Sequence, residues 1–499
     1  MKFLNYFSII FVSILLFSVC KSGNEELASF TNGKIIRSEL QNFYKLKNIE
    51  ADPKTASIKN QISIIENLSL LKIIESQNEK EGLFKSKEFQ SLFDLYKNFI
   101  VADLYRKSFF EKIKKSKDVE LVVAQVIQVG LNSDSAETDP KVIKIWNDLT
   151  SLKEDQKIYD YIVANTEELG SKPIGGFLDP QCINCGQNPV IDILSEGIKN
   201  KDEKFHKFVS QKSVFIYRIT EMKKIKPTAI KDYFIMKLKQ YQKYALKFAE
   251  NAKTDEEKSL ANYYAEEDKK VEYKSSKYAE FITNKFLQVA WNEEVNRIQK
   301  DYNIQISPLF NQKQEEFKEA NFSDDTVLLS SPKKKYTYGE LKNHYDLIKN
   351  FKNNSKDKGD EFTQRINFFL NEYLMAAIIG ETEQASKILD SDEFKMNSVY
   401  LKREISFSTF IRKIQNKDIE ASEEEILQTY EAGKLYSYTM DDPKDSKKKI
   451  TLPLGEVKEK IRSEIKSTKF KKLLEKDIEN LKKSNNLKIY TEKLKEGSL

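Results

Sequence analysis

The sequence predicts a mainly α-helical protein of several domains, with one α+β domain inserted into the helical part. At 499 residues with 39% hydrophobic content, the chain can form more than one core, and we expect two to four domains. Only 15 Gly and 10 Pro occur, a composition that favours long helices. A β-rich segment that begins at Glu120 interrupts the helical periodicity, and this interruption predicts the insert.

The charge balance of the chain argues against one class of partner. Charged residues make up 32% of the sequence, but 83 basic side chains nearly balance 77 acidic ones and leave a formal charge of +6. A dedicated nucleic-acid surface needs a clear excess of basic side chains. We therefore expect no nucleic-acid partner.

The N-terminus has the features of an export signal. A short basic start precedes an apolar run from Phe3 to Val19, and Cys20 follows at its end. A cysteine in this place resembles the lipoprotein box of bacteria, which predicts residues 1–20 as the signal peptide and Cys20 as the lipidated first residue. Phe17 and Val19 depart from the usual box, so an uncleaved signal anchor and ordinary cleavage stay open. No later segment approaches the roughly 20 apolar residues of a membrane span.

After the signal, the sequence predicts a β-hairpin and then helices. Asn32 and Gly33 are the residue types of a tight hairpin turn, and Ser38 is a suitable N-cap for a following helix. Apolar residues then recur at helical spacing in two stripes: Ile64, Leu68, Leu71 and Ile74, and then Phe89, Phe93, Tyr96 and Ile100. We interpret both stripes as core-facing sides of helices rather than as ligand sites.

The insert reads as a compact α+β domain of about a hundred residues. Residues 121–129 are β-rich and end at Gly130, which predicts a strand. Asp139 then starts a helix, a second helical stretch contains Ile158 and Ile162, and Gly175-Gly176 marks a loop. A short helix around residues 189–194 and a closing strand at 214–219 complete the domain.

The remainder of the chain returns to helical periodicity and then repeats the first block. We interpret the charged stretch 254–274 as a solvated helix face. Residues 336–347 parallel 35–46, and Asn486 to Tyr490 parallels Asn303 to Ile306. This pattern indicates a tandem duplication in which only the first copy carries the insert. Chance similarity between two Lys-rich helical segments is the alternative.

The order of these segments resembles the SurA/PrsA/PpiD family of exported chaperones. The resemblance covers most of the mature chain and rests on Ser38-Glu39-Leu40, Gly175 to Leu178, Ser422 to Tyr430 and Gly455 to Ile461, with the segment from Glu81 to Phe89. It implies a first SurA-like helical domain formed by residues 21–117 and 226–312, a parvulin-like domain at 118–225, and a second SurA-like helical domain at 313–499.

The resemblance also implies a function. Such proteins bind unfolded exported or outer-membrane polypeptides in an apolar cradle, which requires apolar surface and mobile lobes but no catalytic residue. The sequence contains 31 Phe and 24 Tyr that could line such a cradle. We expect a periplasmic holdase chaperone, tethered to the membrane through the lipid on Cys20, with unfolded polypeptides as partners and no cofactor.

The parvulin resemblance does not extend to its catalytic residues. The resemblance to active parvulins implies a catalytic pocket lined by two His, one on the first strand of the domain and one on the last. In this sequence these two positions fall on Val126 and Phe215. The chain has 2 His in all, His206 and His344. His206 precedes the last strand, and His344 lies in the repeat of the first helix where its counterpart is Phe43. We therefore expect no catalytic residue and a degenerate domain.

Cys182 and Cys185 are the remaining pair of candidate functional residues. With Cys20 lipidated they are an even pair in an oxidising compartment, which favours a local disulfide. A redox centre would place CxxC at a helix N-terminus after a strand, and zinc would need two further ligands. Free thiols stay open. We expect no metal.

Two other functions stay open beside the holdase. The first is an active prolyl isomerase that uses an unusual set of residues. The second is a surface lipoprotein that binds an external partner with the chaperone fold reused. P-loop, HExxH and GxSxG motifs are absent from the sequence.

Overall fold

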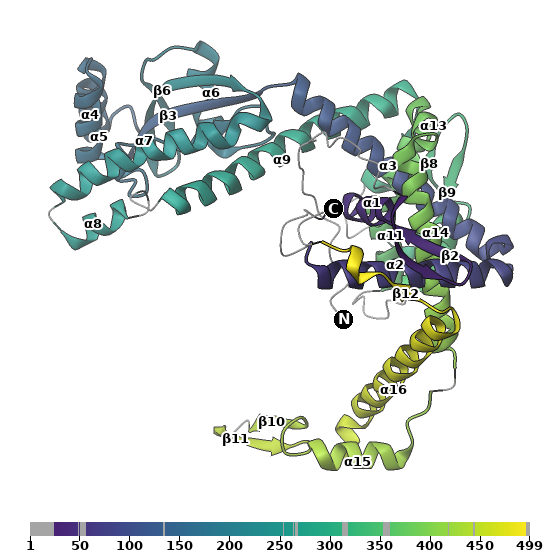
Figure 1. The fold of residues 1–499 in the computed structure, drawn as a ribbon. Helices are drawn as coiled ribbons and strands as arrows, with labels where there is room; N and C mark the ends of the chain where they lie inside the picture. Colours follow the sequence, from purple (N-terminus) through teal and green to yellow (C-terminus); the bar gives the residue numbers. More distant parts are fainter. Residues whose placement is uncertain are drawn as a thin grey trace. The chain divides into compact units, whose positions relative to one another are not determined.

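The computed structural model has a mainly α-helical, multi-domain fold with small antiparallel sheets (Figure 1). It describes residues 24–47, 49, 56–132, 135–252, 254–262, 264, 268–311, 318–352, 360–417, 419–442 and 445–495. The chain divides into two compact units, residues 1–102 with 306–499 (unit 1) and residues 103–305 (unit 2).

Unit 1 begins with the predicted hairpin and helices. Asn32 has a φ of 62°, the left-handed conformation that the tight turn requires. The elements are β1 (Glu26–Phe30), β2 (Gly33–Ile36), α1 (Arg37–Leu46), α2 (Ile58–Lys80) and α3 (Lys87–Ser116), of which α3 continues into unit 2. Ser38, predicted as the N-cap of α1, lies inside the helix, because the cap position is Ile36. The hairpin places Leu27 and Ile35 in a core with Leu40 and Leu68.

A second hairpin and helix in unit 1 repeat this arrangement. The elements are β8 (Val327–Ser330), β9 (Lys335–Thr337), α10 (Tyr338–Lys352), α11 (Glu361–Phe368), a π-helical turn (Phe369–Tyr373), α12 (Leu374–Gly380), α13 (Glu383–Leu389) and α14 (Asp392–Gln415). Each hairpin gains a short third strand on its first strand, in the orders β12-β1-β2 and β7-β8-β9, with β7 at Gln305–Ile306 and β12 at Lys488–Ile489. Asn303 and Asn486, just before these strands, both have positive φ.

The C-terminal part of unit 1 packs against its N-terminal part. Helix α14 lies along α2, where the Arg403 Nε donates to Glu75 Oε2 at 3.0 Å and the Asn78 side chain donates to the Ser406 carbonyl at 2.9 Å. Strand β12 pairs with β1, Ala28 opposite Ile489 (Figure 1). Apolar faces of both parts are thereby buried in one core. Contacts thus group residues 1–102 with 306–499. The domain boundaries predicted from the sequence stay a prediction.

Unit 1 also contains a helix, a hairpin and a long helix near the C-terminus. They are α15 (Glu423–Gly433), β10 (Thr439–Asp442), β11 (Asp445–Thr451) and α16 (Leu454–Ser484). The Ser422 and Glu425 side chains form the capping box of α15. The sequence did not predict the β10-β11 hairpin, because its polar strands lack the apolar alternation of a buried sheet.

Unit 2 contains a four-stranded antiparallel sheet of order β4-β3-β6-β5. Its elements are β3 (Val119–Gly130), α4 (Pro140–Ser151), α5 (Asp155–Asn165), β4 (Gln181–Cys182), α6 (Pro189–Asn200), β5 (His206–Val209) and β6 (Ser213–Ile225). Helices α4 and α5 bury Ile145 and Ile162 with one side of the strands, and α6 buries Leu194 with Val122 and Tyr217. Asp139 caps α4 as predicted.

Long helices complete unit 2: α7 (Ile230–Asn251), α8 (Asp255–Ala261) and α9 (Asp268–Asp301). Helices α7 and α9 run side by side, and their contact buries Phe234 with Phe286 and Leu287 (Figure 1). Across the described ranges of the chain, no helix is both long and apolar enough to cross a membrane.

Candidate functional site

Val126 and Phe215, the two positions predicted to correspond to the histidines of parvulins, lie on one face of the unit 2 sheet. Val126 is paired with Tyr217, and Phe215 is paired with Gln128 and with Phe208 of β5. Val126 is 8% exposed, and the rings of Phe208 and Phe215 lie 6.3 Å apart in the same cluster. These two side chains are therefore apolar, and neither of them can transfer a proton. The degenerate assignment of Val126 and Phe215 stays a prediction, because activity decides it.

His206 lies on the same side of the sheet but is held in a structural contact. Its Nε2 is 2.8 Å from the Asp202 Oδ1, and its ring stacks on Tyr217 at 5.6 Å between centroids. The Tyr217 hydroxyl accepts a hydrogen bond from the Gly197 backbone at 3.3 Å. These contacts join α6 to the sheet, which is a packing role.

His344 lies in unit 1, on α10, and packs against Tyr373 at 5.4 Å between ring centroids. Its Nδ1 is buried without a hydrogen-bond partner. Burial lowers the pKa of His344 below its ordinary value of about 6.5. The neutral form is therefore favoured in the folded protein.

We expect His344 to make unit 1 less stable in acid. The unfolded chain binds a proton at His344 near pH 6.5, whereas the folded chain binds it only at lower pH, so stability falls as pH drops through this window. His344→Phe introduces the residue found at Phe43 of the first repeat. It is expected to remove the contribution of His344 to the loss of stability in acid, and to change the free energy of unfolding at pH 7.5 by less than about 1.5 kcal/mol. Urea unfolding at several pH values measures the free energy of unfolding of both proteins. Equal pH slopes for both proteins would contradict the prediction.

Cys182 and Cys185 form a disulfide, with 5.6 Å between their Cα atoms. Both are buried against Ile282 and Phe286 of α9. Asn184, between them, accepts a hydrogen bond from the Glu120 backbone at 3.0 Å and donates to the Asp118 carbonyl at 3.0 Å. The bridge thus fixes the loop against the start of β3. Cys20 lies outside the described residues, and among the described residues no group of three or more His, Cys, Asp or Glu could hold a metal.

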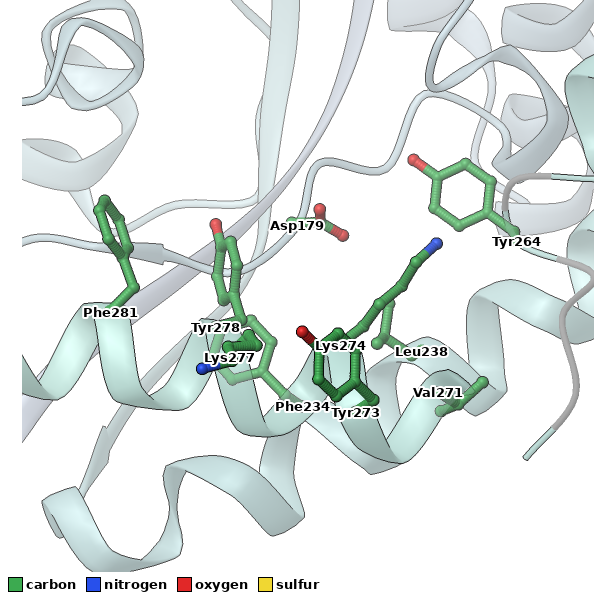
Figure 2. Close-up of a pocket in the computed structure, with 10 residues that line it drawn as sticks. All are labelled: Asp179, Phe234, Leu238, Tyr264, Val271, Tyr273, Lys274, Lys277, Tyr278 and Phe281. Carbon is green, nitrogen blue, oxygen red and sulfur yellow. The ribbon is translucent and has the colours of Figure 1, made fainter. Parts of the chain in front are cut away.

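An aromatic pocket of about 300 Å³ lies in unit 2 between α7, α9 and the loop before β4 (Figure 2). Five rings from these elements and from Tyr264 supply most of its walls. Lysines and one carboxylate supply the polar groups. Its lining comprises Asp179, Phe234, Leu238, Tyr264, Val271, Tyr273, Lys274, Lys277, Tyr278 and Phe281.

Asp179 is the acidic residue of this pocket. Its Oδ1 is buried without a hydrogen-bond partner, and burial raises the pKa of the Asp179 carboxyl, although Lys274 acts in the opposite direction. The neighbouring Leu178 is fixed on both sides, because its backbone N–H donates to Ala124 at 2.9 Å and its carbonyl accepts from the Tyr241 hydroxyl at 2.9 Å. The loop therefore holds a carboxylate in place at an apolar pocket.

Two rings of the pocket are open to solvent. Tyr273 is 65% exposed and Phe281 is 50% exposed, both on α9. Phe234 and Tyr278 continue the aromatic surface inward, with ring centroids 4.4 Å apart. The charge pattern of residues 254–274 predicts a solvated helix face and gives no indication of the pocket. One sequence feature could have indicated the pocket: Tyr273, Tyr278 and Phe281 follow one another at short intervals among lysines.

Comparison with known proteins adds a family but no activity. A family model described only as ":-like" matches residues 2–499. The chain belongs to this family. No curated protein matches the sequence.

The chain is also similar to solved structures, two of which are named here. One comes from a study of two structurally related SurA-like chaperones of Campylobacter jejuni, with 15% identity, a TM-score of 0.20, and coverage of 59% of this chain and 100% of that one. The other is the foldase protein PrsA of Streptococcus pneumoniae, with 13% identity, a TM-score of 0.18, and coverage of 53% and 93%. Likenesses at this level carry no argument about function, which rests on the pocket.

Proposed function

We propose that this protein is a chaperone of the holdase type that binds unfolded exported polypeptides. The observation that carries the proposal is the pocket in unit 2, where an aromatic surface that is open at Tyr273 and Phe281 continues into the interior. A contiguous exposed apolar surface rimmed by polar residues is typical of a binding site. An unfolded polypeptide presents apolar side chains of many kinds, and a pocket of mixed aromatic residues accepts them without a fixed geometry.

The proposal includes a cellular location and a class of client proteins. The N-terminal apolar run ending at Cys20 supports export and a lipid anchor in the cell envelope, with the helical units facing the periplasm. Outer-membrane proteins in transit are the clients with the greatest need of such a binder. A lipid anchor would keep the chaperone beside the membrane where these clients emerge.

The α+β domain acts in this proposal as a structural and binding element without isomerase activity. Apolar Val126 and Phe215 occupy the two strand positions at which proton-bearing side chains would be needed. A proline-isomerisation assay on a short peptide tests this. Clear catalysis by the full chain that is lost on deletion of residues 118–225 would establish the isomerase instead.

Suppression of aggregation tests the holdase function directly. The soluble chain from Lys21 onward, added in stoichiometric amount without nucleotide, is expected to keep a denatured outer-membrane protein in solution. Tyr273→Ser with Phe281→Ser removes the open rings and is expected to weaken client binding on the order of tenfold. Tyr436→Ser is the matched control, because Tyr436 is 82% exposed in unit 1, outside the pocket. Equal protection by all three proteins would reject the pocket as the client site.

A second candidate function is binding of an external partner at the cell surface. It is favoured by the apolar side chains around the β10-β11 hairpin, where Leu435 is 65% exposed and Met440 lies opposite Ile450, both exposed. Protease treatment of intact cells separates the two functions. Cleavage of the protein on intact cells would favour the surface protein, and protection would favour the periplasmic chaperone.

A further inference from the structure

One edge of the unit 2 sheet is left open over half the length of a strand. Strand β6 pairs with β3 along its whole length, from Val119↔Ile225 to Gly130↔Ser213. On its other side, β5 pairs with residues 214–217 of β6 and stops at His206↔Tyr217. Within the described parts of the chain, no strand pairs with β6 beyond Tyr217 on that side. Residues 218–225 therefore form a sheet edge.

The backbone groups that this edge presents follow from the pairing. Ser210 donates to the Ser213 carbonyl at 2.9 Å, so Ser213, and with it Phe215 and Tyr217, turns its N–H and C=O toward β5. The register of β6 shifts by one residue between its partners Val123 and Ala124. After this shift the alternation turns Met222 and Lys224 toward the open edge. These residues carry the donors and acceptors that a further strand would need.

The edge lies beside a cavity of about 350 Å³. Its lining comprises the turn at Lys201, Asp202 and Glu203, residues 219–224 of β6, and Glu120, Leu121 and Ile183 from β3 and the segment after β4. Acidic and basic side chains are mixed in its lining, so it has no single sign of charge that would select a charged ligand. The cavity therefore reaches from this turn across the face of β6 to β3, and its part beside the turn leaves space next to the unpaired edge of β6.

Lysines on a sheet edge often prevent unwanted pairing, but here both are engaged elsewhere. Lys224 Nζ lies 2.6 Å from the Glu120 carboxylate of β3, and Lys223 Nζ lies 4.9 Å from the centre of the Tyr233 ring. Met222, just before these two lysines, is 38% exposed and uncharged. The edge is thus accessible to another backbone.

We propose that the open edge of β6 at residues 218–225 binds an extended segment of an unfolded polypeptide as an added strand, through backbone hydrogen bonds. The proposal rests on the holdase function above and gives it a second mode of binding. Backbone pairing is independent of client sequence, because every residue except proline offers the same N–H and C=O groups. The aromatic pocket binds side chains, whereas this edge binds main chain.

Peptides with blocked backbone groups test the proposal on the full chain from Lys21. The probe is a fluorescently labelled peptide of alternating Thr and Val, about ten residues long, without proline. N-methylation of every second amide blocks one edge of the peptide and keeps its side chains. We expect the methylated peptide to bind at least about tenfold more weakly than the unmodified one when the methyl groups lie on the pairing edge.

A pair of variants at one position tests the protein side. Met222→Pro removes the outward N–H but no hydrogen bond to β3, and proline is tolerated on such an edge; Met222→Thr changes the side chain alone. We expect about a tenfold loss of peptide affinity for Met222→Pro and none for Met222→Thr. Amide exchange provides a readout without mutation, because the Met222 and Lys224 amides are expected to exchange slowly only when peptide is bound.

The outcomes separate this inference from the proposed function. Undiminished binding by Met222→Pro together with unchanged exchange at Met222 and Lys224 overturns the edge site, even where aggregation suppression shows a working holdase. Absence of peptide binding also overturns the edge site. If the unmodified chain does not suppress aggregation, the holdase function itself is overturned, whether or not the peptide binds.

Discussion

Truncation of the chain after Ser484 is expected to lower the free energy of unfolding of unit 1 by about 4–8 kcal/mol. The removed segment supplies β12, whose pairing covers β1, and Leu494, which is 5% exposed in the same core as Leu27. It also supplies two carbonyl groups that accept hydrogen bonds from Arg37 at 2.7 Å and from Gln61 at 2.8 Å. Each of these lost hydrogen bonds costs about 0.5–1.5 kcal/mol, and the lost pairing of β12 and the lost apolar burial of Leu487, Ile489 and Leu494 add to this.

The two tryptophans make this measurement specific. Both Trp146 and Trp291 belong to unit 2, so their fluorescence follows unit 2 while far-UV circular dichroism follows all helices. We expect the truncation to move a circular dichroism transition to lower urea and to leave the fluorescence transition in place. Tyr490→Phe is the control, because it removes only the hydroxyl contact with Ser29 at 2.8 Å and is expected to cost about 1 kcal/mol. A truncated protein as stable as the parent would show that β12 does not hold unit 1 together.

Gly176→Ala is expected to destabilise unit 2 by more than about 3 kcal/mol. Gly176 has a φ of +78°, and a Cβ at this position would lie 2.2 Å from the Val126 carbonyl oxygen and 2.7 Å from Ile162. The Gly176 carbonyl accepts from the Val126 backbone at 2.8 Å, so the loop cannot move away without losing this bond to β3. Strain from the positive φ and overpacking against backbone therefore add.

Gly82→Ala provides the matched control for this prediction. Gly82 has the same φ of +78°, but a Cβ there would meet nothing within 4 Å. It is expected to cost only the conformational strain, about 1 kcal/mol. Urea unfolding followed by tryptophan fluorescence measures the effect of Gly176→Ala on unit 2, and urea unfolding followed by far-UV circular dichroism measures the effect of Gly82→Ala on unit 1. If Gly176→Ala costs no more than Gly82→Ala, the close approach of the loop to β3 is not a constraint on folding.

Features that depend on neighbouring residues could be predicted from the sequence. The turn at Asn32, the helix cap at Asp139 and the capping box at Ser422 each need only side chains and backbone within about four residues. The apolar runs of β3 and β6 could be predicted as strands for the same reason. Strand β5 was missed, because its four residues, from His206 to Val209, are too short for a periodic signal.

The candidate site could not be predicted, because its parts come from distant places in the chain. Asp179 meets Phe234 and Tyr278 only once α7 and α9 have packed beside the loop before β4. The residue types of Tyr273 and Phe281 do not indicate whether another part of the fold packs against this face of their helix. Their function depends on exposure, which is a property of the packed molecule.

The sequence by itself determined the mainly helical class, the position of the β-rich insert, and the absence of histidine at Val126 and Phe215. Only the tertiary structure decided that β12 pairs with β1, that Tyr273 and Phe281 of α9 remain exposed, and that no strand among the described residues pairs with the outer side of β6 beyond Tyr217. The reason is physical: helix, cap and turn preferences act over a few residues, whereas pairing and burial depend on which surfaces meet once the chain has folded.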